Sequence, residues 1–97
     1  MKTTFNALIN SKQPVLIDFS AQWCGPCQMQ SKILEGLVKN FKGRIKIVKI
    51  DVDENQEIAL KQNVFSIPTL VLFRNGNVIW RKTGLSQRDE LLELLNK

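Results

Sequence analysis

Apolar residues follow two kinds of pattern along the chain, and each kind predicts a different element. Short continuous apolar runs predict buried strands over residues 15–19 and 67–73. A stretch in which apolar and basic residues alternate predicts a further strand over 44–52. Apolar positions three and four residues apart predict a helix from Pro26 to about Phe41, because proline is tolerated in a first turn and Gly43 follows the last apolar position.

Weaker patterns predict the shorter elements. These are helices over 5–10 and 53–62, a strand over 78–83 and a last helix after 86–89. Asn75-Gly76 predicts a hairpin before the strand over 78–83, because both central residues of a type I′ turn need positive φ. The stretch from Ser86 to Asp89 resembles a capping box, and leucines then give the last helix its apolar face.

The order of these elements predicts an α/β fold. Strand–helix–strand units pair in parallel through right-handed crossovers, and the hairpin adds an antiparallel edge. We therefore expect a mixed sheet of four strands with helices on both faces. The chain has 97 residues, 43% of them hydrophobic, which suits one domain over 1–97 whose core needs neither disulfides nor a structural metal.

The segment Trp23-Cys24-Gly25-Pro26-Cys27 holds both cysteines of the chain. Their thiols can form a disulfide if the Cα atoms lie roughly 5–6 Å apart, as in the first turn of a helix. Because such a small ring hardly restrains the unfolded chain, the disulfide would add little stability, and a purely structural role is disfavoured. We infer a reversible dithiol–disulfide switch and a function in electron and disulfide transfer.

The two cysteines have different expected roles in that exchange. A helix N-terminus stabilises a thiolate through its dipole and its unpaired N–H groups, so Cys24 is the candidate nucleophile and its pKa is expected to be lowered. Cys27, one turn later, would attack the resulting mixed disulfide and release the reduced substrate. The alternative for Cys24 is a buried, inert cysteine.

Composition excludes several other chemistries. The chain has no histidine, which excludes imidazole acid–base catalysis, Cys/His triads and zinc sites of two cysteines and two histidines. Two cysteines supply half of a closed zinc site, so zinc shared between two chains stays an alternative. We expect no metal and no bound cofactor.

The net charge of +5 is densest between Lys39 and Lys49. Basic residues alternate there with Ile45, Ile47 and Val48, which is typical of the solvated face of a strand. A nucleic-acid patch is the alternative, but no binding module accompanies it, so we expect no nucleic-acid partner. Residues 1–10 lack the apolar run of a signal peptide and no stretch is long enough to span a membrane. We expect a cytoplasmic protein, in which a cysteine pair is more often catalytic or metal-binding than structural.

Taken together, these segments resemble the thioredoxin family over nearly the whole chain. The matching pieces are Asp18-Phe19, the cysteine motif, Lys49, Ile67-Pro68-Thr69, Phe73-Arg74-Asn75-Gly76 and Gly84. The resemblance implies a thioredoxin fold with a sheet of four strands, or five if the N-terminus adds one. It also implies a monomeric thiol–disulfide oxidoreductase that reduces protein disulfides and is re-reduced by a flavin-dependent thioredoxin reductase drawing on NADPH. Gly25-Pro26 between the cysteines favours a reductant.

The resemblance also implies roles for residues outside the cysteine motif. Asp18 would lie beneath the active site and accept the proton of Cys27; burial raises the pKa of such a carboxyl, and Lys49 would lower it again by its charge. The alternatives are a carboxylate at the solvent-facing end of a strand and an exposed lysine. Pro68 is expected to follow a cis peptide bond, the alternative being an ordinary trans proline.

The implied substrate surface is shallow and mostly apolar, and the backbone of Ile67 would pair there with an extended substrate segment. It comprises Trp23, Gly25, Pro26, Ser66, Ile67, Pro68, Thr83, Gly84 and Leu85. Trp80 is expected to pack on the return strand.

The chain departs from the usual family pattern at several positions. Ser20 stands in place of a tryptophan, Lys32 in place of a helix-kinking proline and Ser66 in place of a glycine. The N-terminus is short, so the family's first strand is expected to be truncated or absent. Two further functions stay open: a redox partner dedicated to one pathway, such as peroxide defence, and a binding module whose thiols are dispensable.

Overall fold

Eight helices and strands follow one another in residues 4–96, the part of the chain that the computed structural model describes. They are α1 (Phe5–Ile9), β1 (Val15–Ser20), α2 (Gly25–Phe41), β2 (Lys46–Asp51), α3 (Gln56–Lys61), β3 (Thr69–Arg74), β4 (Asn77–Thr83) and α4 (Arg88–Leu95). Their order agrees with the prediction from the sequence. α3 begins later than predicted, because the Asp51 carboxylate accepts the amides of Asp53 and Glu54 at 2.8 and 3.1 Å and holds them in a turn.

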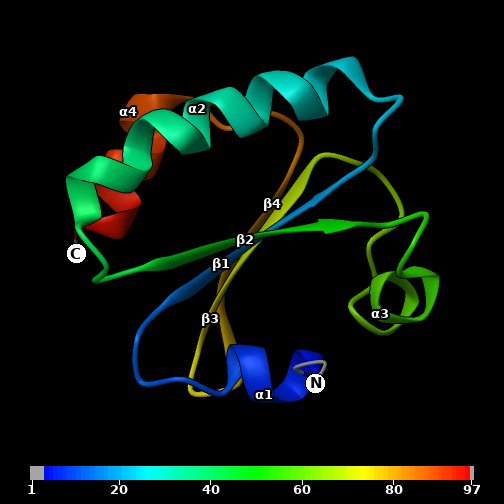
Figure 1. Ribbon diagram of the computed structural model, residues 1–97, viewed down its shortest axis with the longest axis horizontal. Coiled ribbons are helices and arrows are strands. Elements are labelled where there is room, and N and C mark those ends of the chain that lie inside the picture. The colour runs from blue at the N-terminus through cyan, green and yellow to red at the C-terminus, as the bar shows by residue number, and fades with distance from the viewer. Residues whose placement is uncertain (1–3, 97) are drawn as a thin grey trace.

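The strands form one mixed sheet in the order β2-β1-β3-β4. β1 and β2 are parallel and joined by α2, whereas β1 pairs antiparallel with β3, and β3 antiparallel with β4. The predicted mixed sheet with helices on both faces is therefore confirmed (Figure 1). α1 is the first element of the described residues, so no strand precedes β1 there and the sheet has four strands.

The two faces of the sheet bury two separate groups of apolar side chains. Along β1, Val15, Ile17 and Phe19 point to one face and pack with α1 and α3, whereas Leu16 points to the other and packs with α2 and α4. The ribbon shows this division, with α2 and α4 on one side of the sheet and α1 and α3 on the other (Figure 1). Because Asp18 follows the alternation of Leu16, it lies on the face that α2 covers.

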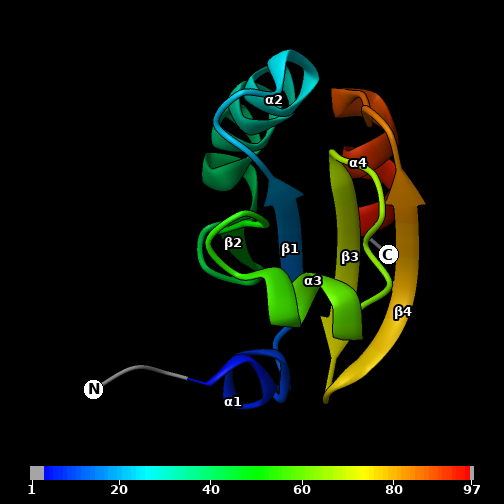
Figure 2. The ribbon, with the colours of Figure 1, turned by 90° about the vertical axis from the view of Figure 1, so that its right-hand side faces the viewer.

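The hairpin between β3 and β4 lies at the opposite end of the sheet from the start of α2 (Figure 2). Asn75 and Gly76 have φ of 52° and 80°, as the predicted turn requires. Their amides donate to the carbonyls of Ser11 and Ile9 at 2.8 and 3.0 Å, which ties the turn to the end of α1. In β4, Ile79 is an extra residue between the pairs Leu72–Trp80 and Phe73–Val78. Trp80 packs in β4, as predicted, and lies on the side of the sheet that faces α2 and α4.

The predicted capping box at the start of the last helix is wrong. Gln87, not Ser86, is the N-cap of α4, and its side chain makes no capping bond within the described part of the chain. Ser86 is buried, and its amide and carbonyl bind the side chain of Gln30 on α2. Gln30, which is distant in sequence, thus binds the backbone of Ser86 where a local capping box was expected.

Candidate active site

The two cysteines lie at the N-terminus of α2. Cys24 is the N-cap residue, Pro26 lies in the first turn, and the Cα atoms of Cys24 and Cys27 are 5.2 Å apart, joined by a disulfide. The amide of Cys27 donates to Sγ of Cys24 at 3.2 Å. In the reduced state the same amide and the helix dipole would face Sγ of Cys24, where they favour a negative charge.

The cysteine pair has apolar surroundings, and the two cysteines differ in their exposure to solvent. Cys24 and Cys27 are 5% and 1% exposed, and they pack with Ala21, Val52 and Ile67. Of the two sulfur-bearing side chains, Cys24 is thus the more accessible to a substrate. Trp23 beside it is 73% exposed, and its Nε1 donates to Oδ2 of Asp53 at 2.8 Å, which fixes the orientation of the indole.

Asp18 is a buried carboxylate in the central strand β1, with a side chain only 1% exposed. Its position pairs in register with Lys49 of β2, so both side chains point to the face that α2 covers. Oγ of Ser31 on α2 donates to Oδ2 at 3.5 Å, whereas Oδ1 has no hydrogen-bond partner among residues 4–96. The solvent-facing position considered for Asp18 is therefore ruled out, whereas Lys49 is exposed, as its alternative predicted.

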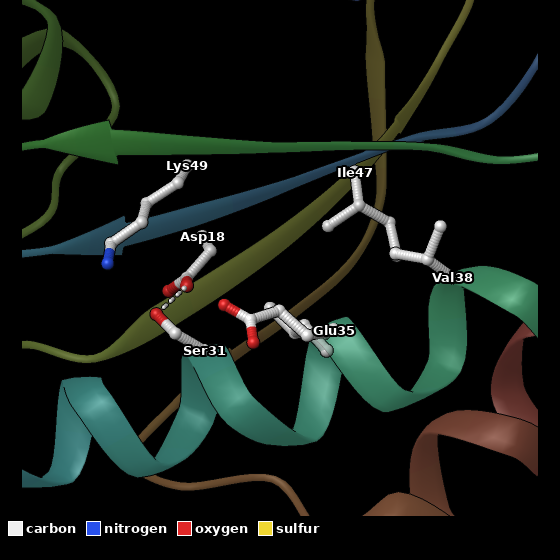
Figure 3. A pocket seen from close by; sticks show the side chains of 7 residues that line it. Asp18, Ser31, Glu35, Val38, Ile47 and Lys49 are labelled. Carbon is white, nitrogen blue, oxygen red and sulfur yellow. Dashed lines mark hydrogen bonds between the residues drawn. The ribbon is translucent and has the colours of Figure 1, made fainter.

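A pocket of about 200 Å³ opens between Asp18 and α2 (Figure 3). Ser31 and Glu35 reach from α2 toward Asp18, and Lys49 reaches from β2. Burial raises the pKa of Asp18 from 3.8 to about 6, while the charge of Lys49 and the hydrogen bond from Ser31 lower it. Asp18 can therefore exchange a proton near neutral pH.

Two loops beside the cysteines are joined by hydrogen bonds. The predicted cis bond between Ile67 and Pro68 is confirmed. The amide of Gly84 donates to the carbonyl of Pro68 at 2.8 Å. Oγ1 of Thr69 donates to the carbonyl of Ser66 at 2.6 Å and lies 3.3 Å from Oγ1 of Thr83. The segments 66–68 and 83–84, both expected to dock substrate, thus form one connected surface.

The comparisons with known proteins identify the family. A family model described as Thioredoxin matches residues 1–97. The chain belongs to the thioredoxin family. It is 43% identical over 90 residues to a thioredoxin of Rickettsia felis, covering 93% of this chain and 86% of that protein. It is 49% identical over 87 residues to a thioredoxin of Bacillus subtilis, covering 90% and 84%.

A solved structure agrees with these relatives. It is described as thioredoxin-2, a component of malaria parasite protein secretion machinery, and superposes with a TM-score of 0.84 at 33% identity, covering 87% of this chain and 82% of that one. As a member of the thioredoxin family with a disulfide between Cys24 and Cys27, the chain is a thiol–disulfide oxidoreductase that reduces protein disulfides.

The positions that depart from the usual thioredoxin pattern have distinct surroundings. Ser20 is fully buried at the end of β1, and within the described residues its Oγ has no hydrogen-bond partner. Lys32 is exposed on α2, which is one unbroken helix from Gly25 to Phe41. Ser66 is exposed, and its carbonyl accepts the Thr69 hydroxyl.

Sequence reasoning missed one exposed aromatic side chain beside the site. Phe65 is 78% exposed and, with Trp23, Val52, Val64, Ser66 and Ile67, lines a groove of about 350 Å³. The sequence could have indicated its exposure, because Phe65 is a large apolar residue directly before the expected docking segment and outside every predicted helix. Gly25, Pro26 and Thr83 are exposed as well, whereas Gly84 and Leu85 are half-buried and Pro68 is buried.

Sequence reasoning also missed Ser31 and Gln30. Ser31 lies four residues after Cys27 on α2, and this spacing places both on one side of the helix. The partners of Ser31 and Gln30 are Asp18 and Ser86, which no local pattern connects to them.

Two general features of the described residues complete the site. Among residues 4–96, no three acidic, cysteine or histidine side chains gather closely enough to bind a metal ion. Within the same range, none of the helices combines the length and the apolar character needed to cross a membrane.

Proposed function

We propose that Cys24 is the nucleophile and Cys27 the resolving thiol of this thioredoxin. The Cys24 thiolate attacks one sulfur of a substrate disulfide, forms a mixed disulfide and displaces the other sulfur, which takes up a proton. The Cys27 thiolate then attacks Sγ of Cys24, and the second substrate sulfur leaves as a thiol. Two electrons pass to the substrate, and the protein ends as the Cys24–Cys27 disulfide.

The observation that carries this assignment is the position of Cys24 at the N-cap of α2, with the Cys27 amide on its sulfur. That sulfur is the one whose negative charge the helix stabilises, and Cys24 is the less buried of the pair. Cys27, 1% exposed, is reached by a neighbouring sulfur more easily than by a protein substrate.

We further propose that Asp18 accepts the proton of the Cys27 thiol, through water, and that Lys49 tunes it. The pKa of about 6 supports this role, because such a group is largely ionised near neutral pH yet basic enough to take a proton. The bond from Ser31, on the same helix as Cys27, supports a location beneath the cysteine pair.

The substrate surface that we propose consists of Trp23, Gly25, Pro26, Ser66, Ile67, Pro68, Thr83 and Gly84. An extended segment of the substrate would pair with the backbone of Ile67 and lay its side chains against Trp23. Support comes from the exposed Trp23 and from the hydrogen bonds that join segments 66–68 and 83–84.

The remaining partners follow from the redox cycle. Each turnover oxidises the cysteine pair, so the protein needs a reductant, and we propose a flavin-dependent thioredoxin reductase that draws on NADPH. We propose that the protein is cytoplasmic, since the cytoplasm supplies such a reductant. We further propose that it is a monomer with one domain over 1–97.

A trapping experiment tests the two cysteine roles. In the Cys27→Ser variant the mixed disulfide with oxidised insulin cannot be resolved, so it should accumulate on Cys24 and be seen by mass spectrometry under non-reducing conditions. The matched control, Cys24→Ser, should trap little or none. Equal trapping by both variants would contradict the assignment, and undiminished biological function of Cys24→Ser would favour a binding module.

A further inference from the structure

Gln30 is a polar side chain that is fully buried on α2, three residues after Cys27. Its Nε2 donates to the carbonyl of Ser86 at 3.1 Å, and its Oε1 accepts the amide of Ser86 at 2.7 Å. An amide side chain can make both bonds at once, whereas a leucine or methionine makes neither and leaves the backbone of Ser86 unpaired. Among residues 4–96, the hydrogen bonds that offset the cost of burying this glutamine are those to Ser86, 56 positions away in sequence.

Ser86 belongs to segment 83–86, which begins with Thr83, the last residue of β4, and includes the proposed substrate-docking residues Thr83 and Gly84. Gly84 has a φ of 97°. Because glycine can adopt many other backbone conformations, this residue does not by itself hold the segment in one position. Its amide donates to the carbonyl of Pro68. A chain of contacts therefore runs from Gln30 through segment 83–86 to the cis-proline loop.

We propose that Gln30 is a positioning residue for protein substrates: it holds segment 83–86 at a fixed distance from α2, and so fixes the docking surface relative to Cys24. This inference rests on the proposed docking surface. Gln30 acts through the backbone of Ser86 and touches no reacting atom, so it affects how a protein substrate is aligned and leaves the chemistry of the cysteines alone.

The test compares two disulfide substrates in the Gln30→Met variant, whose side chain has similar length, no hydrogen-bond donor and only a weakly accepting sulfur. With insulin, which needs the docking surface, KM should rise about tenfold while kcat stays within about twofold. With hydroxyethyl disulfide, which is too small to span the surface, the rate should stay within about twofold of wild type. The reduction potential should also be unchanged.

A control separates positioning from general loss of stability. Leu95→Ala removes a buried side chain from the same α2–α4 core without touching segment 83–86. Its KM for insulin should stay near that of the wild type. An equal rise in KM in Leu95→Ala, an unchanged KM in Gln30→Met, or an equal loss with hydroxyethyl disulfide would each overturn the inference.

A measurement on the wild-type protein keeps the inference testable if Gln30→Met fails to fold. The amide of Ser86 should exchange slowly with solvent deuterium, because it is bonded to Gln30, and exchange as fast as an open loop amide would overturn the inference. If the proposed function itself were wrong, the Cys27→Ser variant, in which Gln30 is intact, would form no mixed disulfide on Cys24.

Discussion

At the scale of single residues, Asp18 sets how stability changes with pH. Burial raises the pKa of its carboxyl from 3.8 to about 6 in the folded protein. Well below pH 3.8 the carboxyl is protonated in both the folded and the unfolded chain, so its burial carries no charge penalty there. Between about pH 4 and about pH 6 the carboxyl ionises in the unfolded chain more readily than in the folded protein, so the free energy of unfolding falls as pH rises. Above about pH 6 the carboxyl is ionised in the folded protein as well, and the full cost of the buried charge is present.

Asp18→Asn should therefore stabilise the protein at alkaline pH. The shift in pKa corresponds to about 3 kcal/mol, so the free energy of unfolding at about pH 8 should exceed that of the wild type by up to this amount. Urea unfolding at about pH 4 and about pH 8 measures it. The advantage of the variant should shrink toward pH 4, and a difference that does not change with pH would contradict the account.

The contacts of Asp18 predict a graded series of pKa changes. The charge of Lys49 and the hydroxyl of Ser31 both lower the pKa of Asp18, so Lys49→Met and Ser31→Ala should each raise it above about 6, with Lys49→Met giving the larger rise. Ser20→Ala is the matched control, because no bond of the Ser20 hydroxyl is seen within residues 4–96. An NMR titration of the carboxyl carbon of Asp18 reads the three values. A rise in Ser20→Ala as large as in Ser31→Ala would refute the role of the Ser31 bond.

At the scale of helices and strands, the sequence predicted what depends on local patterns. The apolar runs predicted β1 and β3, the three- and four-residue spacing predicted α2, and Asn75-Gly76 predicted the hairpin. The beginnings of α3 and α4 were predicted poorly, because side-chain bonds from Asp51 and from Gln30 decide them. The Gln30 bond joins residues 56 apart in sequence, which no local pattern reveals.

The start of α4 offers a stabilising substitution. Gln87 has the extended backbone of an N-cap, with φ −81° and ψ 160°, but among the described residues its side chain caps no amide. Gln87→Asp should add the missing bond and raise the free energy of unfolding by about 1 kcal/mol. Gln62→Asp is the control, since Gln62 is the C-cap of α3, where a negative charge gains nothing from the helix dipole. Equal effects of the two changes in urea unfolding would contradict this explanation.

At the scale of the whole molecule, the fold brings together at one end of the sheet residues that are far apart in sequence. The N-terminus of α2, the cis-proline loop and segment 83–86 meet there, while the β3–β4 hairpin lies at the other end (Figure 2). The spacing of the cysteines predicted a redox pair, and the resemblance to the thioredoxin family pointed to Asp18. Ser31, Gln30 and Phe65 were not predicted, since their importance depends on neighbours that only the folded chain supplies.

Cys24 and Cys27 form a reversible pair that donates electrons to protein disulfides. Its most direct test is the equilibrium reduction potential of the pair, measured in graded thiol–disulfide buffers by alkylation and mass spectrometry. With Gly25-Pro26 between the cysteines, we expect a potential more reducing than that of the cytosolic glutathione pool. A clearly more oxidising potential, or a pair that does not titrate at all, would contradict it.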